Sequence, residues 1–120
     1  MANPNVVAVS SIYANTAVDA DVAASAVSLL QANTNKLIKV NSLIIANIDG
    51  VNAADISVWI TRSSVDYYIA KTISVPADST LIPIDKNMGL YLVEDDILKI
   101  QASAAGDLSA VCSYEEIDDA

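Results

Sequence analysis

Histidine and phenylalanine are absent from this 120-residue sequence, and cysteine occurs once, at Cys112. Without histidine the chain lacks the commonest general base and the commonest metal ligand, so no Ser-His-Asp, Cys-His or histidine-containing zinc constellation can form within it. A single thiol cannot make an internal disulfide, which favours assembly in a reducing cytoplasm. We therefore expect neither an enzyme nor a fold held by disulfides.

Basic residues are scarce, because 6 Lys and Arg stand against 15 Asp and Glu for a net charge of −9. No window clusters cations as a phosphate-tracking surface would, so nucleic-acid binding is not expected. The acidity fits either simple solubility or a docking face for a basic partner, and the sequence leaves both open. The densest apolar run, at 43–46, is far shorter than the ~18 residues that span a bilayer, so we expect no membrane segment.

Glycine is also rare, and its three positions are too far apart to form a phosphate-binding loop. Acidic residues do occur in groups, at 19/21, 94–96, 115/116 and 118/119. Carboxylates could bind Ca²⁺, but the dense ligand spacing of an EF-hand loop is missing. We therefore expect solvated turns and tails at these positions, with no metal and no cofactor. Cys112 shares a strand face with apolar residues, which predicts a buried and unreactive thiol.

What the sequence does contain is Ala, Val, Ile, Ser and Thr, with 53% hydrophobic residues recurring mostly at every second position. The clearest example is 55–62, where Ile56, Val58 and Ile60 share one face. Polar and Gly-containing turns separate such segments at intervals near ten residues. The expected strands are 6–14, 23–30, 36–47, 55–62, 67–75, 80–85, 98–103 and 108–114. Within the last of these, Val111 breaks the alternation.

The fold class expected from this pattern is all-β: an antiparallel two-sheet sandwich, jelly-roll-like, of about eight short strands. One segment, 18–31, is rich in Ala and Leu and could instead be a helix capped by Asp19 or Asp21. We favour a strand there because its neighbours are β. We expect one domain over residues 1–120, with short polar tails at 1–5 and 117–120.

From Lys36 onward the order of elements is specific. A strand ends in Ala46-Asn47, and later come 56–61, the Tyr-bearing 67–70, the turn 75–77, the segment 90–100 and the closing 113–117. This order resembles a group of small structural proteins of tailed bacteriophages, found among head decoration (cement), neck and tail components. The family often places Gly in the acidic turn where this chain has Glu94-Asp95-Asp96, so a tighter turn cannot be carried over.

The resemblance implies an oligomeric β-sandwich that is assembled in the host bacterial cytoplasm and docks on major capsid, neck or tail proteins of the virion. It favours a non-enzymatic decoration or cement role. The alternative is a fibre-type β-sandwich module that binds a carbohydrate or a receptor.

Candidate interface residues come from the strand pattern. Trp59 lies on the face opposite Ile56, so it faces solvent, a partner or cover from its own chain. One residue of the Tyr67-Tyr68 pair must face outward. The stretch 37–45 is apolar on both faces in its second half, which suggests cover from a partner. The candidates are therefore Trp59, Tyr67, Tyr68, Leu43 and Ile45.

Overall fold

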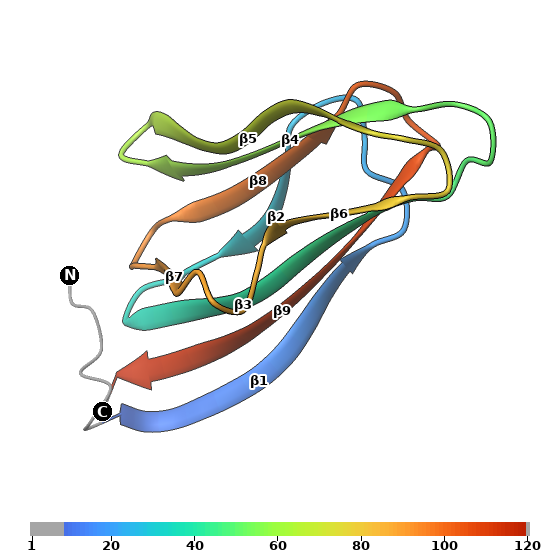
Figure 1. The fold of residues 1–120 in the computed structure, drawn as a ribbon. Coiled ribbons are helices and arrows are strands. Elements are labelled where there is room, and N and C mark those ends of the chain that lie inside the picture. The colour runs from blue at the N-terminus through green and yellow to red at the C-terminus, as the bar shows by residue number, and fades with distance from the viewer. Residues whose placement is uncertain (1–8, 120) are drawn as a thin grey trace.

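The computed structural model describes residues 9–119, which contain nine β-strands and no helix (Figure 1). The strands are β1 (Val9–Asp19), β2 (Val27–Gln31), β3 (Lys36–Asn47), β4 (Ala54–Arg62), β5 (Val65–Val75), β6 (Thr80–Ile84), β7 (Leu90–Leu92), β8 (Ile97–Ala102) and β9 (Leu108–Asp119). None of the described residues belongs to a helix that could cross a membrane.

The strands form two antiparallel sheets that face each other (Figure 1). The first sheet has the order β1-β9-β3-β6, with β7 also paired to β3, and the second has the order β2-β8-β4-β5. Apart from the β4–β5 hairpin and the β6–β7 link, every connection passes from one sheet to the other. This strand order is that of a jelly roll. The expected all-β, two-sheet sandwich is confirmed.

The core lies between the sheets and is built from aliphatic side chains. Val40, Leu43 and Ile45 of β3 meet Ile56 and Val58 of β4 across the interior, as strand alternation requires. Between Val40 and Ser42 the β3–β9 register shifts by one residue. Because the shift changes the alternation, the inward positions of β3 are even-numbered before it and odd-numbered after it.

The expected strands mostly match the structure, and 36–47 matches it residue for residue. The expected strand 6–14 is wrong at its end, because β1 continues to Asp19; its residues 6–8 lie outside the described range. The expected strand 23–30 begins too early, and β2 starts at Val27. The short β7 was not expected as a strand. The helical alternative over 18–31 is wrong, because this segment consists of the end of β1, an irregular stretch with bends, and β2.

The predicted polar tail at 117–120 is also wrong for the residues that the structure describes, since β9 runs to Asp119. Ile117 is buried, and the Asp118 carboxylate accepts hydrogen bonds from Lys36 Nζ (2.6 Å) and Ser11 Oγ (3.0 Å). This charged sequence is held as a strand because β1 and β3 pair with it on both sides. The predicted tail at 1–5 lies outside the described residues.

The β4–β5 hairpin turns through Ser63 and Ser64, which both have positive φ (52° and 64°). Two residues with positive φ between the closing pair Arg62–Val65 form a type I′ turn. The backbone twist of this turn type matches the right-handed twist of the two strands of a hairpin. Asn-Gly is the favoured sequence for this turn, because non-glycine residues are strained there.

Replacing Ser63 by Asn and Ser64 by Gly together should therefore stabilise the protein by about 1 kcal/mol. Chemical denaturation followed by circular dichroism measures this change. Ser64→Ala is the control, because it keeps a side chain at positive φ and should give no gain. A double variant no more stable than the original would show that the turn is unstrained.

Candidate interaction surfaces

An apolar row crosses the outer face of the first sheet. Val18 of β1 pairs with Val111 of β9, which pairs with Ile44 of β3, so their side chains share one face. It is the outer face, because the adjacent Cys112 is buried in the core. On β6, the exposed Ile82 lies between Leu81 and Ile84, which pair with Ile45 and Leu43 on either side of Ile44. We call Val18, Val111, Ile44 and Ile82 the outer row. Val18 is 70% exposed, and a contiguous apolar surface of this kind is typical of a contact site.

A second row lies on the same face near the other end of β9. Ile12 of β1 pairs with Ile117 of β9, and Ile117 pairs with Leu37 of β3. Ile117 and Leu37 are buried, whereas Ile12 is 51% exposed. The outer face of the first sheet therefore carries apolar side chains at two levels, and at the second level only Ile12 of β1 is exposed.

The outer face of the second sheet carries an aromatic stack. Trp59 of β4 pairs with Tyr68 of β5, and their ring centroids are 5.3 Å apart. Lys71 Nζ lies over the Tyr68 ring, 5.0 Å from its centroid. The stack leaves Trp59 only 4% exposed, and its Nε1–H has no hydrogen-bond partner among the described residues. Burying this donor unpaired costs about 1–3 kcal/mol, so the stack is held by packing.

The candidate interface residues divide into two groups. Leu43 and Ile45 are completely buried between the sheets, and Trp59 is covered by its own chain, so none of the three offers a surface. Tyr67 (56% exposed) and Tyr68 (48% exposed) are at the surface, on opposite faces of β5.

Sequence reasoning missed the outer row. The one signal for it was Val111, whose break in alternation marks an aliphatic side chain that points outward.

The described residues show little that could support chemistry. A depression of about 200 Å³ lies beside Tyr68 and Lys71, below the roughly 300–1,000 Å³ of typical ligand pockets. Among residues 9–119, no three His, Cys, Asp or Glu residues are grouped to hold a metal ion. Burial raises the pKa of the Cys112 thiol to about 12, so it stays protonated at neutral pH. This agrees with the expected inert thiol.

The acidic turn at 94–96 is structural, not solvated as expected. Asp96 is 1% exposed and receives two hydrogen bonds from Arg62, from Nε (2.8 Å) and from an Nη atom (2.6 Å). Glu94 is also buried, and its Oε2 accepts the Asn35 backbone N–H at 2.7 Å. Asp95 takes the positive φ (71°) that glycine would adopt most easily. The two buried carboxylates tie this turn to the neighbouring turn and to β4.

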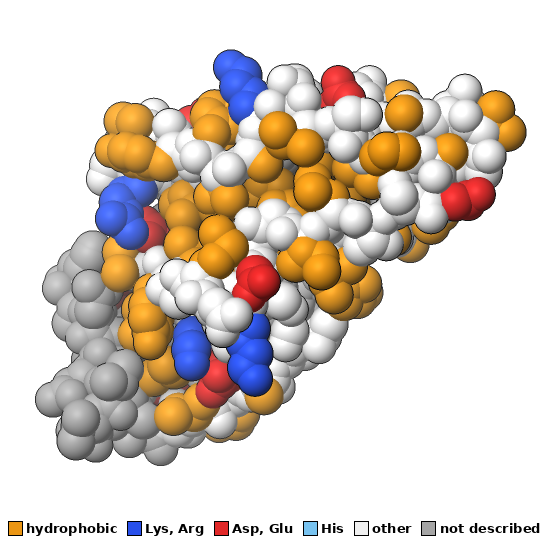
Figure 2. Space-filling view, viewed as in Figure 1, with side chains coloured by type: hydrophobic (Ala, Val, Ile, Leu, Met, Phe, Trp, Pro, Cys, Tyr) orange, Lys and Arg blue, Asp and Glu red, His pale blue; other side chains and the backbone are white. Residues whose placement is uncertain are grey.

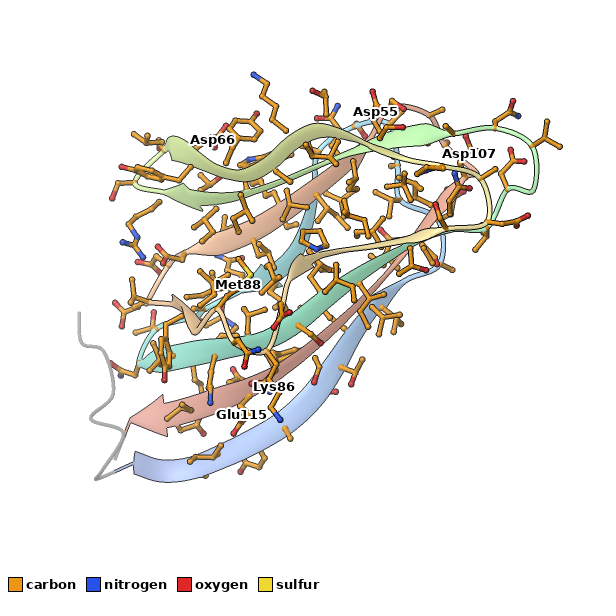
Figure 3. The ribbon with its side chains drawn as sticks, viewed as in Figure 1. Asp55, Asp66, Lys86, Met88, Asp107 and Glu115 are labelled. Atoms are coloured by element: carbon orange, nitrogen blue, oxygen red, sulfur yellow. The ribbon has the colours of Figure 1, made fainter. Side chains whose placement is uncertain are left out.

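Acidic side chains collect at the opposite end of the sandwich, which lies at the right in Figures 2 and 3. Asp21 accepts the Gly106 N–H there, and the Asp49 and Asp107 carboxyl groups share a hydrogen bond. Figure 3 places Asp55 at this end as well, and Figure 2 shows no Lys or Arg on its visible surface. A partner that docked at this end would need a basic surface.

The pKa values of two carboxylates at the surface move in opposite directions. The hydrogen bond with Asp49, helped by the nearby negative charge, raises the pKa of Asp107 above 3.8. Asp49 receives backbone N–H bonds from Val51 and Asn52, which lower its own pKa. Lys36 and Ser11 lower the pKa of Asp118.

With this geometry established, comparison with known proteins identifies the class of fold. No protein-family model matches the sequence, and no curated protein matches it. Among solved structures, one that is similar is a subunit of Bacillus endospore appendages, described as a novel family of disulfide-linked pili. Its TM-score is 0.53 at 17% identity, covering 91% of this chain and 89% of that one.

The VP2 protein of infectious bursal disease virus, from a subviral particle, is also similar. It has a TM-score of 0.54 at 13% identity and covers 91% of this chain, which spans only 33% of the VP2 chain. A structure of the Gx strain of the same virus gives a TM-score of 0.51 at 14% identity, over 90% of this chain and 32% of that one. At these identities the likeness establishes a shared fold and no more.

Tyr68→Ala should uncover Trp59, the single tryptophan of the chain. We expect its fluorescence emission to shift to longer wavelength and the free energy of unfolding to fall by about 1 kcal/mol as the aromatic pair is lost. Tyr67→Ala removes an equally exposed ring on the other face of β5 and should leave the emission unchanged. Equal spectra for the two variants would contradict this arrangement.

Asp107→Asn should raise the melting temperature at pH 7. The amide of Asn can donate a hydrogen bond to Asp49 at any pH, whereas the Asp107 carboxyl group can donate only while it is protonated. The pKa of Asp107 is raised by folding, so the hydrogen bond of the acid form is present below pH 3.8 and lost as pH rises. The gain should therefore shrink in acid.

Asp118→Asn is the matched control, because folding lowers the pKa of Asp118. Its stabilising effect is present above pH 3.8 and lost as pH falls, so this variant should be less stable at pH 7 and equal to the original in strong acid. Thermal melts from pH 2 to 8 measure both variants. The same sign for both would refute the assignment.

Proposed function

We propose that this chain is a non-enzymatic structural protein of a tailed-phage virion, where it stabilises the particle by packing against capsid, neck or tail proteins. A decoration or cement role is favoured. The order of elements from Lys36 to Ile117 supports the phage assignment through the resemblance described above. The shared fold with a viral shell protein and a pilus subunit is consistent with a role in assembly.

The outer row is the observation that carries the proposal. Val18 and Val111 expose large aliphatic side chains on neighbouring strands, and Ile82 exposes another on β6, beyond the half-buried Ile44 of β3. Scattered exposed aliphatic residues are ordinary, but a row that crosses a whole sheet leaves apolar area in water that contact with another protein would bury. The exposed Tyr68 on the outer face of the second sheet adds a second region suited to contact.

The alternative, a carbohydrate- or receptor-binding fibre module, has less support. The depression beside Tyr68 is small, and Trp59, which would be the natural platform for a sugar ring, is covered. Glycan binding that Tyr68→Ala abolished would favour the alternative.

The test uses phage particles prepared without this protein, to which the purified chain is added back. We expect the chain to bind such particles and to raise their resistance to heat or chelator. Val111→Lys together with Ile82→Lys should abolish binding without unfolding the chain, because both side chains are exposed. Val51→Lys, at an 84% exposed loop position outside the outer row, is the control. A chain that binds no such particle would overturn the proposal.

A further inference from the structure

The sandwich has free strand edges on both sheets. Among residues 9–119, β1 and the β6/β7 pair border the first sheet, while β2 and β5 border the second. A free edge exposes unpaired backbone N–H and C=O groups that can pair with a strand from another chain. Natural proteins protect such edges with short strands, proline, bulges or charged side chains.

Three of the edges carry these devices. β2 is short and its register shifts after Ser28, while β6 contains Pro83 and β7 has only three residues. β5 is long, but its register against β4 shifts twice. It also carries the exposed Lys71 beside Thr72, whose φ is +48°. Bulges and charge of this kind disfavour pairing with a second strand.

β1 carries none of them between Ser11 and Asp19. Its register against β9 is unbroken over these residues, which include no proline and no charge before Asp19. Exposed apolar side chains occupy both of its faces, with Ile12 and Val18 on the outer face and Tyr13 on the other. Figure 1 shows β1 at the border of the first sheet with no strand beyond it.

We propose that the free edge of β1 pairs antiparallel with β1 of a second copy of this chain, about a twofold axis at Asn15. This inference rests on the proposed assembly function and names the surface through which copies meet. A twofold contact uses the same patch on both subunits, so β1 must be complementary to itself. The sequence of β1 meets that condition in one register.

With Asn15 opposite Asn15 of the second copy, the whole unbroken stretch 11–19 is paired. Ile12 then faces Val18 of the second copy, and Val18 faces its Ile12, so the exposed aliphatic residues of the outer face meet in two pairs. The bulky Tyr13 faces the small Ala17 of the second copy. The two Asp19 side chains lie at opposite ends of the ladder, where they do not repel each other.

This register also joins the two apolar levels of the outer face. In each copy Val18 ends the outer row, and Ile12 ends the row that contains Ile117 and Leu37. Pairing Val18 with Ile12 of the second copy joins the two rows across the dimer. The exposed part of this contact is the outer row of each copy extended by Ile12 of the other, because Ile117 and Leu37 are buried.

A disulfide test reports the register directly. Asn15→Cys places two thiols on the twofold axis, and directly opposed antiparallel residues have Cα atoms about 4.5–5.5 Å apart, within the range of a disulfide. Cys112 is buried and does not compete. Under mild oxidation of the full chain at micromolar concentration we expect rapid, near-complete crosslinked dimer from Asn15→Cys. We expect little from the control Val51→Cys, at a loop position that is 84% exposed.

Charge variants test the same contact by light scattering. Val18→Lys should raise the dimer dissociation constant about tenfold or more, because two apolar cross-strand pairs are lost. The matched control Val51→Lys should not change it. Adding Ile12→Glu to Val18→Lys sets Glu against Lys at both pairs, so the dimer should return at low salt and weaken at high salt. Circular dichroism checks that each variant is folded.

Three results would overturn the inference: an original chain that stays monomeric at all concentrations, a dimer that Val18→Lys leaves intact, or equal crosslinking of Asn15→Cys and Val51→Cys. The proposed function is judged separately by particle binding. A chain that binds particles but does not pair through β1 would refute only the β1–β1 dimer. A chain that pairs through β1 but binds no particle would refute only the proposed virion role.

Discussion

The pairing of β9 with β1 on one side and β3 on the other is the interaction on which the first sheet depends. Its inward residues, such as Ala110 and Cys112, fill the core, while its outward Val111 and Ile117 form the middle of both apolar rows. Near its end, Asp118 joins Lys36 of β3 and Ser11 of β1. The register of β9 therefore determines both which of its side chains fill the core and which form the apolar rows on the outer face.

A filled interior restricts where this protein can act. The aliphatic side chains of the two sheets occupy the space that larger barrels leave for a ligand, and the single thiol is sealed within it. Buried polar side chains, such as Asn47 and Asp96, form hydrogen bonds that fix the loops. Asn47 Nδ2 donates to the backbone carbonyl oxygens of Asn52 and Val75. What remains for recognition is the outside: sheet faces, strand edges and the acidic end.

The sequence allowed the fold class to be predicted because the buried strands alternate clearly and turns separate them, as in β3 and β4. The bounds of β1 were predicted poorly. Most residues on both of its faces are exposed, so apolar and polar residues do not alternate in its sequence. The burial of Trp59 could not be predicted, because Tyr68 covers it only in the shifted β4–β5 register. The burial of Asp96 could not be predicted either, because its partner Arg62 lies far away in the sequence. Tyr68 is exposed, and its role at an interface stays a prediction. The outer row could not be predicted, because it depends on the order of the strands in the sheet, which the periodicity of the sequence does not contain.

The only strand partner of β1 within the described residues is β9, the last strand of the chain, so Tyr13 must find Glu116 across almost the whole sequence. Such distant pairing is slow and comes late, because the intervening chain must be ordered first. The first sheet can therefore close only after β9 has joined β3, which delays any assembly through the free edge of β1 until the rest of the sandwich has formed.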